Sequence, residues 1–269
     1  MDSRLVRDNV NSIKYERNLV LILSVMDTGL KDDFKFETAM RLLPLSAQAS
    51  VLRKKFQEDK IKTLCNRLLQ MFGCLLISGL EYKNELKFKR GKFGKPKLDC
   101  PAVNVSFSMS NGEDHVCMYV QKNGCANSEV PVELGIDIAS VKDLQKIEEL
   151  ELYRDIFTDL EYETLLNHPK DGIHKLFAHY WSLKESYTKY LGTGLNIDLK
   201  QVDTGPIKID QLETVRDIYS KSIKFQSFWV SPEKEEIISV CQDNDISNDI
   251  PTVYNVSLNE ILEYLEGHS

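Results

Sequence analysis

Trp181-Ser-Leu-Lys-Glu-Ser-Tyr-Thr-Lys189 is the stretch from which the fold of this chain can be deduced. It lies within a helical pattern from about Gly172 to Leu191, which Gly192 and Gly194 end. The apolar face of that pattern contains Leu176, Tyr180, Leu183, Tyr187 and Leu191. Residues four apart turn about 400° on a helix, so Glu185 and Lys189 share one side. They could converge on one ligand, although such a pair is by itself more often a solvated salt bridge.

Outward from this helix, the chain alternates strand and helix patterns. We predict strands at Leu19–Val25, Val116–Gln121 and Pro131–Ile138, and a long helix at Val51–Leu80. Further along, Ile223–Val230 and Glu235–Cys241 predict a hairpin, and Ser257-Leu-Asn-Glu260 predicts a capping box that begins a last helix. The long helix places Leu52, Phe56, Leu64, Leu68, Met71 and Leu75 on one face. This order predicts an α+β fold of two related halves, residues 1–134 and 135–269.

The composition restricts the class of function. A net charge of −7 over 269 residues argues against a surface that tracks nucleic acid. The apolar run Leu19–Val25 is too short to cross a bilayer, so we expect no membrane segment. The six cysteines form no C-x-x-C pair, and we expect reduced thiols in a reducing compartment, the cytoplasm.

Two further segments carry charged groups that suggest a site. Asp137 lies in the apolar strand Leu134-Gly-Ile-Asp-Ile138, where a buried carboxylate needs a partner or a metal, unless it only caps a loop. If Asp137 and Glu185 meet, they form an oxygen-ligand site suited to Mg²⁺. The loop Arg90-Gly-Lys-Phe-Gly-Lys-Pro96 could hold phosphate or be a solvated turn, and it lacks the P-loop spacing.

These segments, in this order, resemble one enzyme family. Phe157-Thr-x-x-Glu161, Trp181-x-Leu-Lys-Glu-Ser-x-x-Lys189 and Gly192-x-Gly-Leu195 resemble the signature of the surfactin-type phosphopantetheinyl transferases. Gly135-Ile-Asp-Ile138 and the Arg90–Pro96 loop resemble that family's metal strand and basic loop. Among its members, the chain looks most like the eukaryotic kind that primes aminoadipate reductase in lysine biosynthesis. The resemblance implies a fold of two pseudo-symmetric halves, each with a long helix on a mostly antiparallel sheet.

The resemblance also implies an activity and site residues. The enzyme would transfer the 4'-phosphopantetheine group of coenzyme A to a serine of an apo carrier protein and release 3',5'-ADP. Asp137 and Glu185 would bind Mg²⁺, Glu185 would also be the base, and Lys189 would stabilise the transferring phosphoryl group. Lys184 would help to position the ligand. Arg90 and Lys95 would hold the nucleotide end of coenzyme A.

Two departures from the family pattern bear on affinity. Many members carry a glutamate where this chain has Ala139, and we expect water to fill that position. A phosphate-contacting histidine corresponds to Asn111 in Phe107-Ser-Met-Ser-Asn111, although a register through Asn104-Val-Ser106 stays open. Asn111 can hydrogen-bond a phosphate but carries no charge. The alternative function is a non-catalytic module of the same fold that binds coenzyme A or carrier proteins. We expect a monomer, and the sequence does not choose the carrier.

Overall fold

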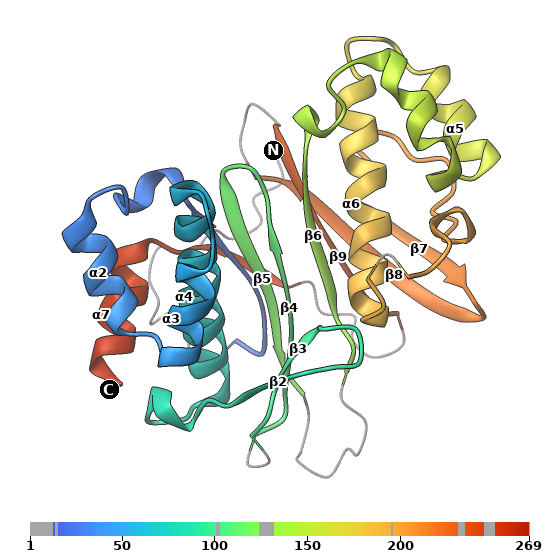
Figure 1. Cartoon of the computed structure of the whole chain (residues 1–269). Coiled ribbons are helices and arrows are strands. Elements are labelled where there is room, and N and C mark those ends of the chain that lie inside the picture. The colour runs from blue at the N-terminus through green and yellow to red at the C-terminus, as the bar shows by residue number, and fades with distance from the viewer. Residues whose placement is uncertain are drawn as a thin grey trace. The chain divides into compact units, whose positions relative to one another are not determined.

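The computed structural model describes Ile13 and residues 16–100, 103–123, 132–194, 196–230, 235–244 and 251–268 (Figure 1). The chain forms two compact units. The first comprises Met1–Lys89, Pro96–Val132 and Asp249–Ser269, and the second comprises Arg90–Lys95 and Glu133–Asn248. The chain enters the second unit briefly at Arg90–Lys95 and again after residue 132, and its last segment returns to the first unit.

The first unit is built on a mostly antiparallel sheet with strand order β10-β1-β5-β4. Its strands are β1 (Asn18–Ser24), β4 (Val105–Asn111), β5 (His115–Lys122) and β10 (Thr252–Asn255), with the short pair β2 (Phe88–Arg90) and β3 (Pro96–Leu98) forming a separate ladder. β10 runs parallel to β1, whereas β1, β5 and β4 are antiparallel. The predicted strands at Leu19–Val25 and Val116–Gln121 are confirmed to within two residues at each end.

One long helix, α4 (Gln57–Ser78), covers this sheet and contacts β1, β4 and β5. The shorter helices are α2 (Asp33–Arg41), α3 (Leu45–Leu52) and α7 (Leu258–Gly267), with single 3₁₀ turns at Met26–Thr28 and Lys83–Glu85. On α4, Leu64, Leu68 and Leu75 are fully buried, as their spacing predicts. Gly79, with φ 72°, ends the helix in the left-handed conformation that glycine adopts without strain.

The predicted start of this helix at Val51 is wrong. α3 ends at Leu52, and α4 begins only at Gln57. Leu52 and Phe56 are therefore exposed, at 59% and 63%. Their i,i+4 spacing continues the apolar period, but Phe56 has extended backbone and caps α4, so the period crosses a break between two helices.

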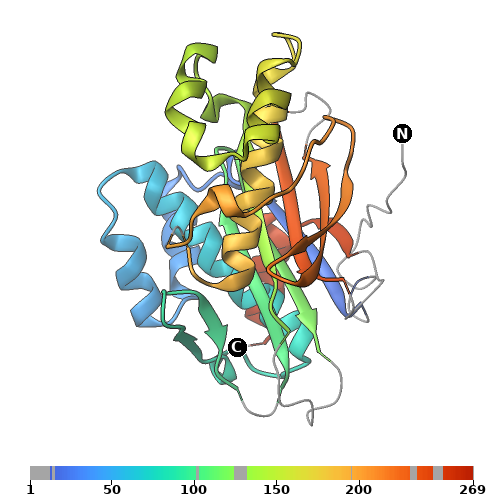
Figure 2. The same cartoon turned by 90° about the vertical axis from the view of Figure 1, so that its right-hand side faces the viewer.

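The second unit repeats the plan with an antiparallel sheet of strand order β6-β9-β8-β7. Its strands are β6 (Gly135–Ser140), β7 (Glu213–Ile218), β8 (Lys221–Trp229) and β9 (Glu236–Asp243), and its helical segments are η3 (Val141–Asp143), η4 (Ile147–Ile156), α5 (Asp159–Leu166), α6 (Ile173–Leu191) and η5 (Leu199–Gln201). In Figure 1 and Figure 2, α6 runs along one face of this sheet, where it packs on β6, β9 and β8. The predicted hairpin is confirmed as β8 and β9, which are antiparallel; its turn at Ser231-Pro232 lies outside the described residues.

The predicted helix from about Gly172 to Leu191 is confirmed as α6, with Gly172 as its N-cap and Gly192, at φ 69°, as its C-cap. Four of the five predicted core residues are buried, but Leu191 is 37% exposed because it lies in the last turn. Each unit thus contains a long helix on a small, mostly antiparallel sheet, which is the predicted α+β fold.

The last helix begins as its sequence predicts. Ser257 caps α7, and its hydroxyl accepts a hydrogen bond from the Glu260 amide while the Glu260 carboxylate accepts one from the Ser257 amide. This is the capping box expected from Ser257-Leu-Asn-Glu260. Within the described part of the chain no helix is long and apolar enough to cross a membrane.

The cysteines that the structure describes are free thiols. Cys65, Cys74, Cys117 and Cys241 are buried, and Cys100 is partly exposed; Cys125 lies outside the described residues. Burial raises the pKa of the Cys65 thiol to about 12, so this side chain behaves as a small core residue rather than a nucleophile.

Candidate active site

β6 approaches α6 closely because of one glycine. A Cβ atom added to Gly135 would lie 1.9 Å from the Ser186 carbonyl oxygen and 2.7 Å from the Tyr190 nitrogen, so no other residue fits this contact. Two residues further on, the Asp137 side chain points from the same face of the strand and is 8% exposed. The glycine therefore allows the Asp137 carboxylate to lie against the helix.

Asp137 meets the C-terminal half of α6 through Lys189. The Lys189 ammonium donates to the Asp137 carboxylate, with Nζ and Oδ1 2.6 Å apart. The Lys189 side chain is 27% exposed, so its ammonium is partly accessible to solvent, whereas the Asp137 carboxylate is buried. The structure thus brings together two of the residues that the sequence singled out, from segments more than fifty positions apart.

Glu185 lies one helical turn before Lys189. Its carboxylate is half-buried, and among the described residues its Oε1 atom is enclosed without a hydrogen-bond partner. Burial and the negative charge of Asp137 raise the pKa of Glu185, while Lys189 opposes that rise. Burying a carboxylate oxygen without a hydrogen-bond donor costs free energy. A cation or a proton donor that bound to this atom would remove that cost.

Asp137 and Glu185 are close enough for the charge of Asp137 to act on Glu185, and their donor atoms are of the kind that suits a magnesium ion. Both supply the carboxylate oxygens that Mg²⁺ prefers, and Glu185 has an unused oxygen to offer. Among the described residues no group of three or more histidine, cysteine or acidic side chains could hold a metal. A Mg²⁺ ion at this pair would complete its coordination with water and substrate phosphate oxygens, as such ions commonly do.

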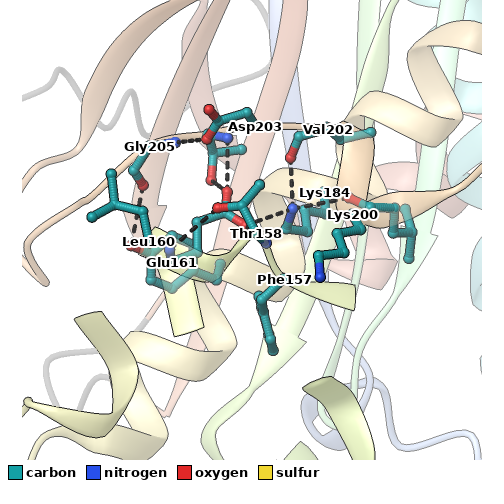
Figure 3. Close-up of polar contacts among 12 residues, drawn as sticks. Phe157, Thr158, Leu160, Glu161, Lys184, Lys200, Val202, Asp203 and Gly205 are labelled. Atoms are coloured by element: carbon teal, nitrogen blue, oxygen red, sulfur yellow. Dashed lines mark hydrogen bonds and ion pairs between the residues drawn. The ribbon is translucent and has the colours of Figure 1, made fainter. Parts of the chain in front are cut away.

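Lys184 is fully buried and lies away from that carboxylate pair. Its ammonium donates to Glu161 at 2.8 Å and to the carbonyl oxygens of Leu199 and Val202 at 3.0 and 2.6 Å (Figure 3). Burial lowers the pKa of Lys184, and the charge of Glu161 opposes that effect. An ammonium has three donors, and these contacts use all of them.

Lys95 holds the basic loop to the end of α6. Its ammonium donates to the Glu133 carboxylate and the Leu134 carbonyl, both at 2.9 Å, and to the Tyr190 carbonyl at 3.2 Å. The last contact satisfies one of the carbonyl groups that a helix leaves open at its C-terminus. Arg90, at the other end of the loop, is exposed and donates to the Gly94 carbonyl.

Asn111 lies in the first unit, at the end of β4. Its side-chain oxygen accepts a hydrogen bond from Asn66 on α4, with Nδ2 and Oδ1 2.7 Å apart. β4 pairs with β5 so that Asn111 lies opposite Val116. The hydrogen bond between the Asn66 and Asn111 side chains is exposed to solvent, so the Asn111 amide group is not part of the core.

Ala139 continues the face of β6 that carries Asp137. It is buried and belongs to an apolar cluster with Ala178 and Ile237, against which Trp181 and Trp229 pack. The expected water-filled position is therefore lined by apolar side chains, because the strand is covered by α6 at this point. Leu195 of the signature lies outside the described residues.

Glu161 has a role that the sequence reasoning did not assign. Its carboxylate is fully buried beside Lys184 and caps the first turn of α5. Thr158-x-x-Glu161 is a capping-box pattern, which identifies the helix start but not the second partner of the glutamate.

Both family models and the related proteins that match this chain carry the name of one enzyme class, the phosphopantetheinyl transferases. Residues 133–241 match the model of the 4'-phosphopantetheinyl transferase superfamily, and residues 31–123 match that of the 4'-phosphopantetheinyl transferase N-terminal region. The chain is 38% identical over 252 residues to the L-aminoadipate-semialdehyde dehydrogenase-phosphopantetheinyl transferase of Saccharomyces cerevisiae, covering 91% of this chain and 89% of that protein. It is 39% identical to the protein of that name from Candida glabrata over 83% of both chains. It is 33% identical to the 4'-phosphopantetheinyl transferase Sfp of Bacillus subtilis over 44% of this chain and 46% of that protein.

Proposed function

The chain belongs to the 4'-phosphopantetheinyl transferase superfamily, and we propose that Asp137, Glu185 and Lys189 form its catalytic centre. As a member of this family, the enzyme transfers the 4'-phosphopantetheine group of coenzyme A to a carrier protein. The observation that carries the site proposal is the enclosed Oε1 of Glu185, which has no partner among the described residues and lies on the helix that bears Lys189.

Asp137 and Glu185 would hold the metal, which we propose to be Mg²⁺. When bound, the ion would supply positive charge to the pyrophosphate of coenzyme A. The protein's own contribution is to hold two carboxylates on a strand and a helix that are locked together at Gly135. Such rigid placement is what a transfer that depends on charge and position requires.

Glu185 is proposed as the base that takes the proton of the carrier serine hydroxyl. Its carboxylate is acceptor-only when ionised, and it has an enclosed oxygen without a hydrogen-bond partner among the described residues, so it can accept a proton from a hydroxyl that lies within hydrogen-bond reach. The serine oxygen then forms a bond to the phosphorus that bears pantetheine, and 3',5'-ADP leaves with the electrons of the broken bond. Glu185 holds the proton that the hydroxyl loses.

Lys189 is proposed to stabilise the negative charge that develops on the phosphoryl oxygens. Its partial exposure leaves the ammonium accessible to a substrate while Asp137 orients it. A preorganised cation of this kind stabilises the transition state without reorganisation at the moment of reaction.

The nucleotide end of coenzyme A is proposed to contact Arg90, an exposed cation of the basic loop. Asn111, an exposed amide at the end of a strand, can hydrogen-bond a phosphate, and that role stays a separate proposal. The ammonium of Lys95 is held by three protein acceptors, so we propose that it contributes mainly by fixing the Arg90–Lys95 loop. Lys184 likewise has no unused donor, and we assign it a positioning role.

The physiological carrier is proposed to be an aminoadipate reductase, in lysine biosynthesis. This proposal is supported by the names of the relatives from Saccharomyces cerevisiae and Candida glabrata, which are 38% and 39% identical to this chain over the aligned residues. We further propose that the enzyme acts as a monomer in the cytoplasm, a compartment in which thiols such as Cys65 stay reduced.

The carrier proposal is tested by competition. Apo carrier domains of an aminoadipate reductase and of a fatty-acid synthase are incubated together with limiting enzyme, coenzyme A and Mg²⁺, and the holo forms are followed by mass spectrometry. We expect the reductase domain to be converted first, with the higher kcat/KM. Preferential conversion of the fatty-acid synthase domain would contradict the carrier proposal but not the transfer activity.

A further inference from the structure

A closed polar network lies beside the proposed catalytic centre, on the same helix. Its central pair is Lys184 of α6 and Glu161 of α5, whose side chains are both 0% exposed and whose Nζ and Oε2 atoms are 2.8 Å apart. Figure 3 shows this pair with the segment that follows α6. Two oppositely charged groups are thus held entirely away from solvent.

Every polar atom of the pair has a partner. Glu161 Oε1 accepts hydrogen bonds from the Thr204 amide at 2.8 Å and the Thr204 hydroxyl at 2.7 Å. Glu161 Oε2 accepts one from the Thr158 amide at 2.8 Å in addition to the Lys184 ammonium. The Lys184 ammonium donates its other two hydrogen bonds to the carbonyl oxygens of Leu199 and Val202.

The network joins three segments that are separate in the sequence. Thr158 is the N-cap of α5 and Glu161 lies in its first turn, Lys184 belongs to α6, and residues 199–204 belong to the segment after α6. Removing one partner would leave a buried charge or buried carbonyls without a partner, whereas small shifts of α6 would break several hydrogen bonds together. The network therefore defines one rotational setting of α6.

That setting determines where Glu185 points. Consecutive helical residues point about 100° apart, so fixing Lys184 against the 199–204 segment fixes the direction of Glu185. Lys189 lies one turn further along the same helix and contacts Asp137. Both proposed catalytic groups thus depend on the rotation that Lys184 sets.

We propose that Glu161 and Lys184 act as one positioning unit that sets α6 for the reaction, and that Lys184 does not contact coenzyme A. This inference rests on the proposed roles of Glu185 and Lys189. It differs from a phosphate-binding role for Lys184 because it makes Glu161 equally important and makes the two residues interdependent.

A double-mutant cycle in the full-length enzyme tests the inference. Glu161→Gln, Lys184→Met and the double variant are assayed for kcat and for the KM of coenzyme A with one apo carrier domain. We expect each single change to lower kcat by about 10- to 100-fold, because small misplacements of reacting groups cost this much. The KM of coenzyme A should change by less than about threefold, and the double variant should be no worse than the poorer single variant, because interacting residues are not additive.

Two results would overturn the inference. One is a large rise in the KM of coenzyme A for Lys184→Met with kcat retained, which a direct phosphate contact predicts. The other is a double variant whose loss equals the product of the single losses. If the variants at the ion pair do not fold, Thr204→Val decides: it removes one hydroxyl donor to Glu161, and an unchanged kcat in a folded Thr204→Val enzyme would overturn the inference.

Two controls separate this inference from stability and from the site proposal. Ile223→Val shortens a core side chain of the same unit outside the network and should leave kcat unchanged. Glu185→Gln is measured alongside. If it stays active, the proposed catalytic centre fails; if it is inactive while the network variants keep the wild-type kcat, the positioning inference alone fails.

Discussion

Among single residues, Glu185 carries the most chemical information. Its enclosed Oε1 atom has no donor among the described residues, although a carboxylate is costly to bury without one. Burial raises the pKa of Glu185, the charge of Asp137 adds to that rise, and Lys189 opposes it. A half-buried carboxylate with an oxygen that lacks a donor among the described residues can act as a metal ligand or as a base, the two roles that we propose for Glu185.

Glu185→Gln should lower kcat at least about 100-fold, because the amide cannot accept the serine proton and such proton transfer contributes 10²- to 10⁴-fold. Transfer to an apo carrier is measured by intact-mass spectrometry, and folding by thermal unfolding. Glu163→Gln, the same chemical change at an exposed position of α5, serves as the matched control and should keep the wild-type rate. A Glu185→Gln enzyme with a near-normal rate would refute the proposed base and metal ligand.

His179 makes stability depend on pH. It is buried on α6, its Nε2 contacts the Ser227 hydroxyl at 3.0 Å, and burial lowers its pKa from 6.5 to about 4. Between these pH values the unfolded chain takes up a proton that the folded chain does not. The histidine's contribution is therefore intact above pH 6.5 and is lost as the pH falls toward 4, by up to about 3 kcal/mol at 1.36 kcal/mol per pKa unit.

Urea denaturation of the wild type and His179→Gln at pH 7 and pH 4.5 measures this effect. The unfolding free energy of the variant should fall less between the two pH values than that of the wild type. His168→Gln, at a partly exposed histidine, should keep the wild-type difference. Equal pH dependence in the wild type and His179→Gln would show that another group is responsible.

The sequence singled out Asp137, Glu185 and Lys189, and the structure brings Asp137 and Lys189 into contact. The sequence does not show the partners of the other lysines. The helical period shows that Lys184 and Glu185 point in different directions. It does not show that the carbonyls of Leu199 and Val202 surround Lys184, because those carbonyls come from a segment without a regular pattern. The contacts of Lys95 with Leu134 and Tyr190 escape the sequence for the same reason.

Between elements, the contact of β6 with α6 positions the proposed site. Gly135 lets the strand touch the helix backbone, and Asp137 reaches Lys189 from the same strand face. Gly135→Ala would place a carbon 1.9 Å from a backbone oxygen, a separation that real structures relieve by shifting the strand.

Gly135→Ala should destabilise the protein by about 1–3 kcal/mol or more, the usual cost of overpacking, and should lower kcat at least tenfold even where the enzyme stays folded. Chemical denaturation and the transfer assay measure the two effects. Gly267→Ala introduces the same methyl group in α7, where nothing lies within 4 Å, and should be neutral. Full activity in Gly135→Ala would show that the strand can move without consequence for the site.

The same elements show where pattern reasoning succeeds. α6 was predictable because its apolar period is unbroken and glycines mark both ends. The start of α4 was not, since the period continues from Leu52 through Phe56 across a break in the backbone. Helices α2 and α5 were not predicted. The apolar period of α2 is short, with three buried side chains in nine residues, and the capping-box pattern Thr158-x-x-Glu161 at the start of α5 was overlooked.

For the whole molecule, the return of the chain to its first unit could not be deduced from the sequence. β10 pairs in parallel with β1, and α7 packs on α4, so residues from both ends of the chain share one core. The capping box predicted the start of α7 but not its neighbours. Local patterns define elements, whereas the pairing of distant strands depends on the entire chain.

The family is shown by matches that together extend from residue 31 to residue 241, and the transfer reaction follows from it. Metal dependence and the roles of Asp137, Glu185 and Lys189 are proposals that rest on the site geometry. They share one consequence at the level of the whole enzyme: transfer should need both the carrier serine and a divalent ion.

The most direct test is intact-mass spectrometry of an apo carrier domain incubated with this enzyme, coenzyme A and Mg²⁺, with EDTA in a parallel sample. We predict that the carrier gains the mass of one phosphopantetheine group, that EDTA prevents the gain, and that excess Mg²⁺ restores it. A gain that persists in EDTA would contradict the metal site at Asp137 and Glu185. No gain on any of several apo carriers, with coenzyme A still bound, would instead indicate a binding module without catalytic activity.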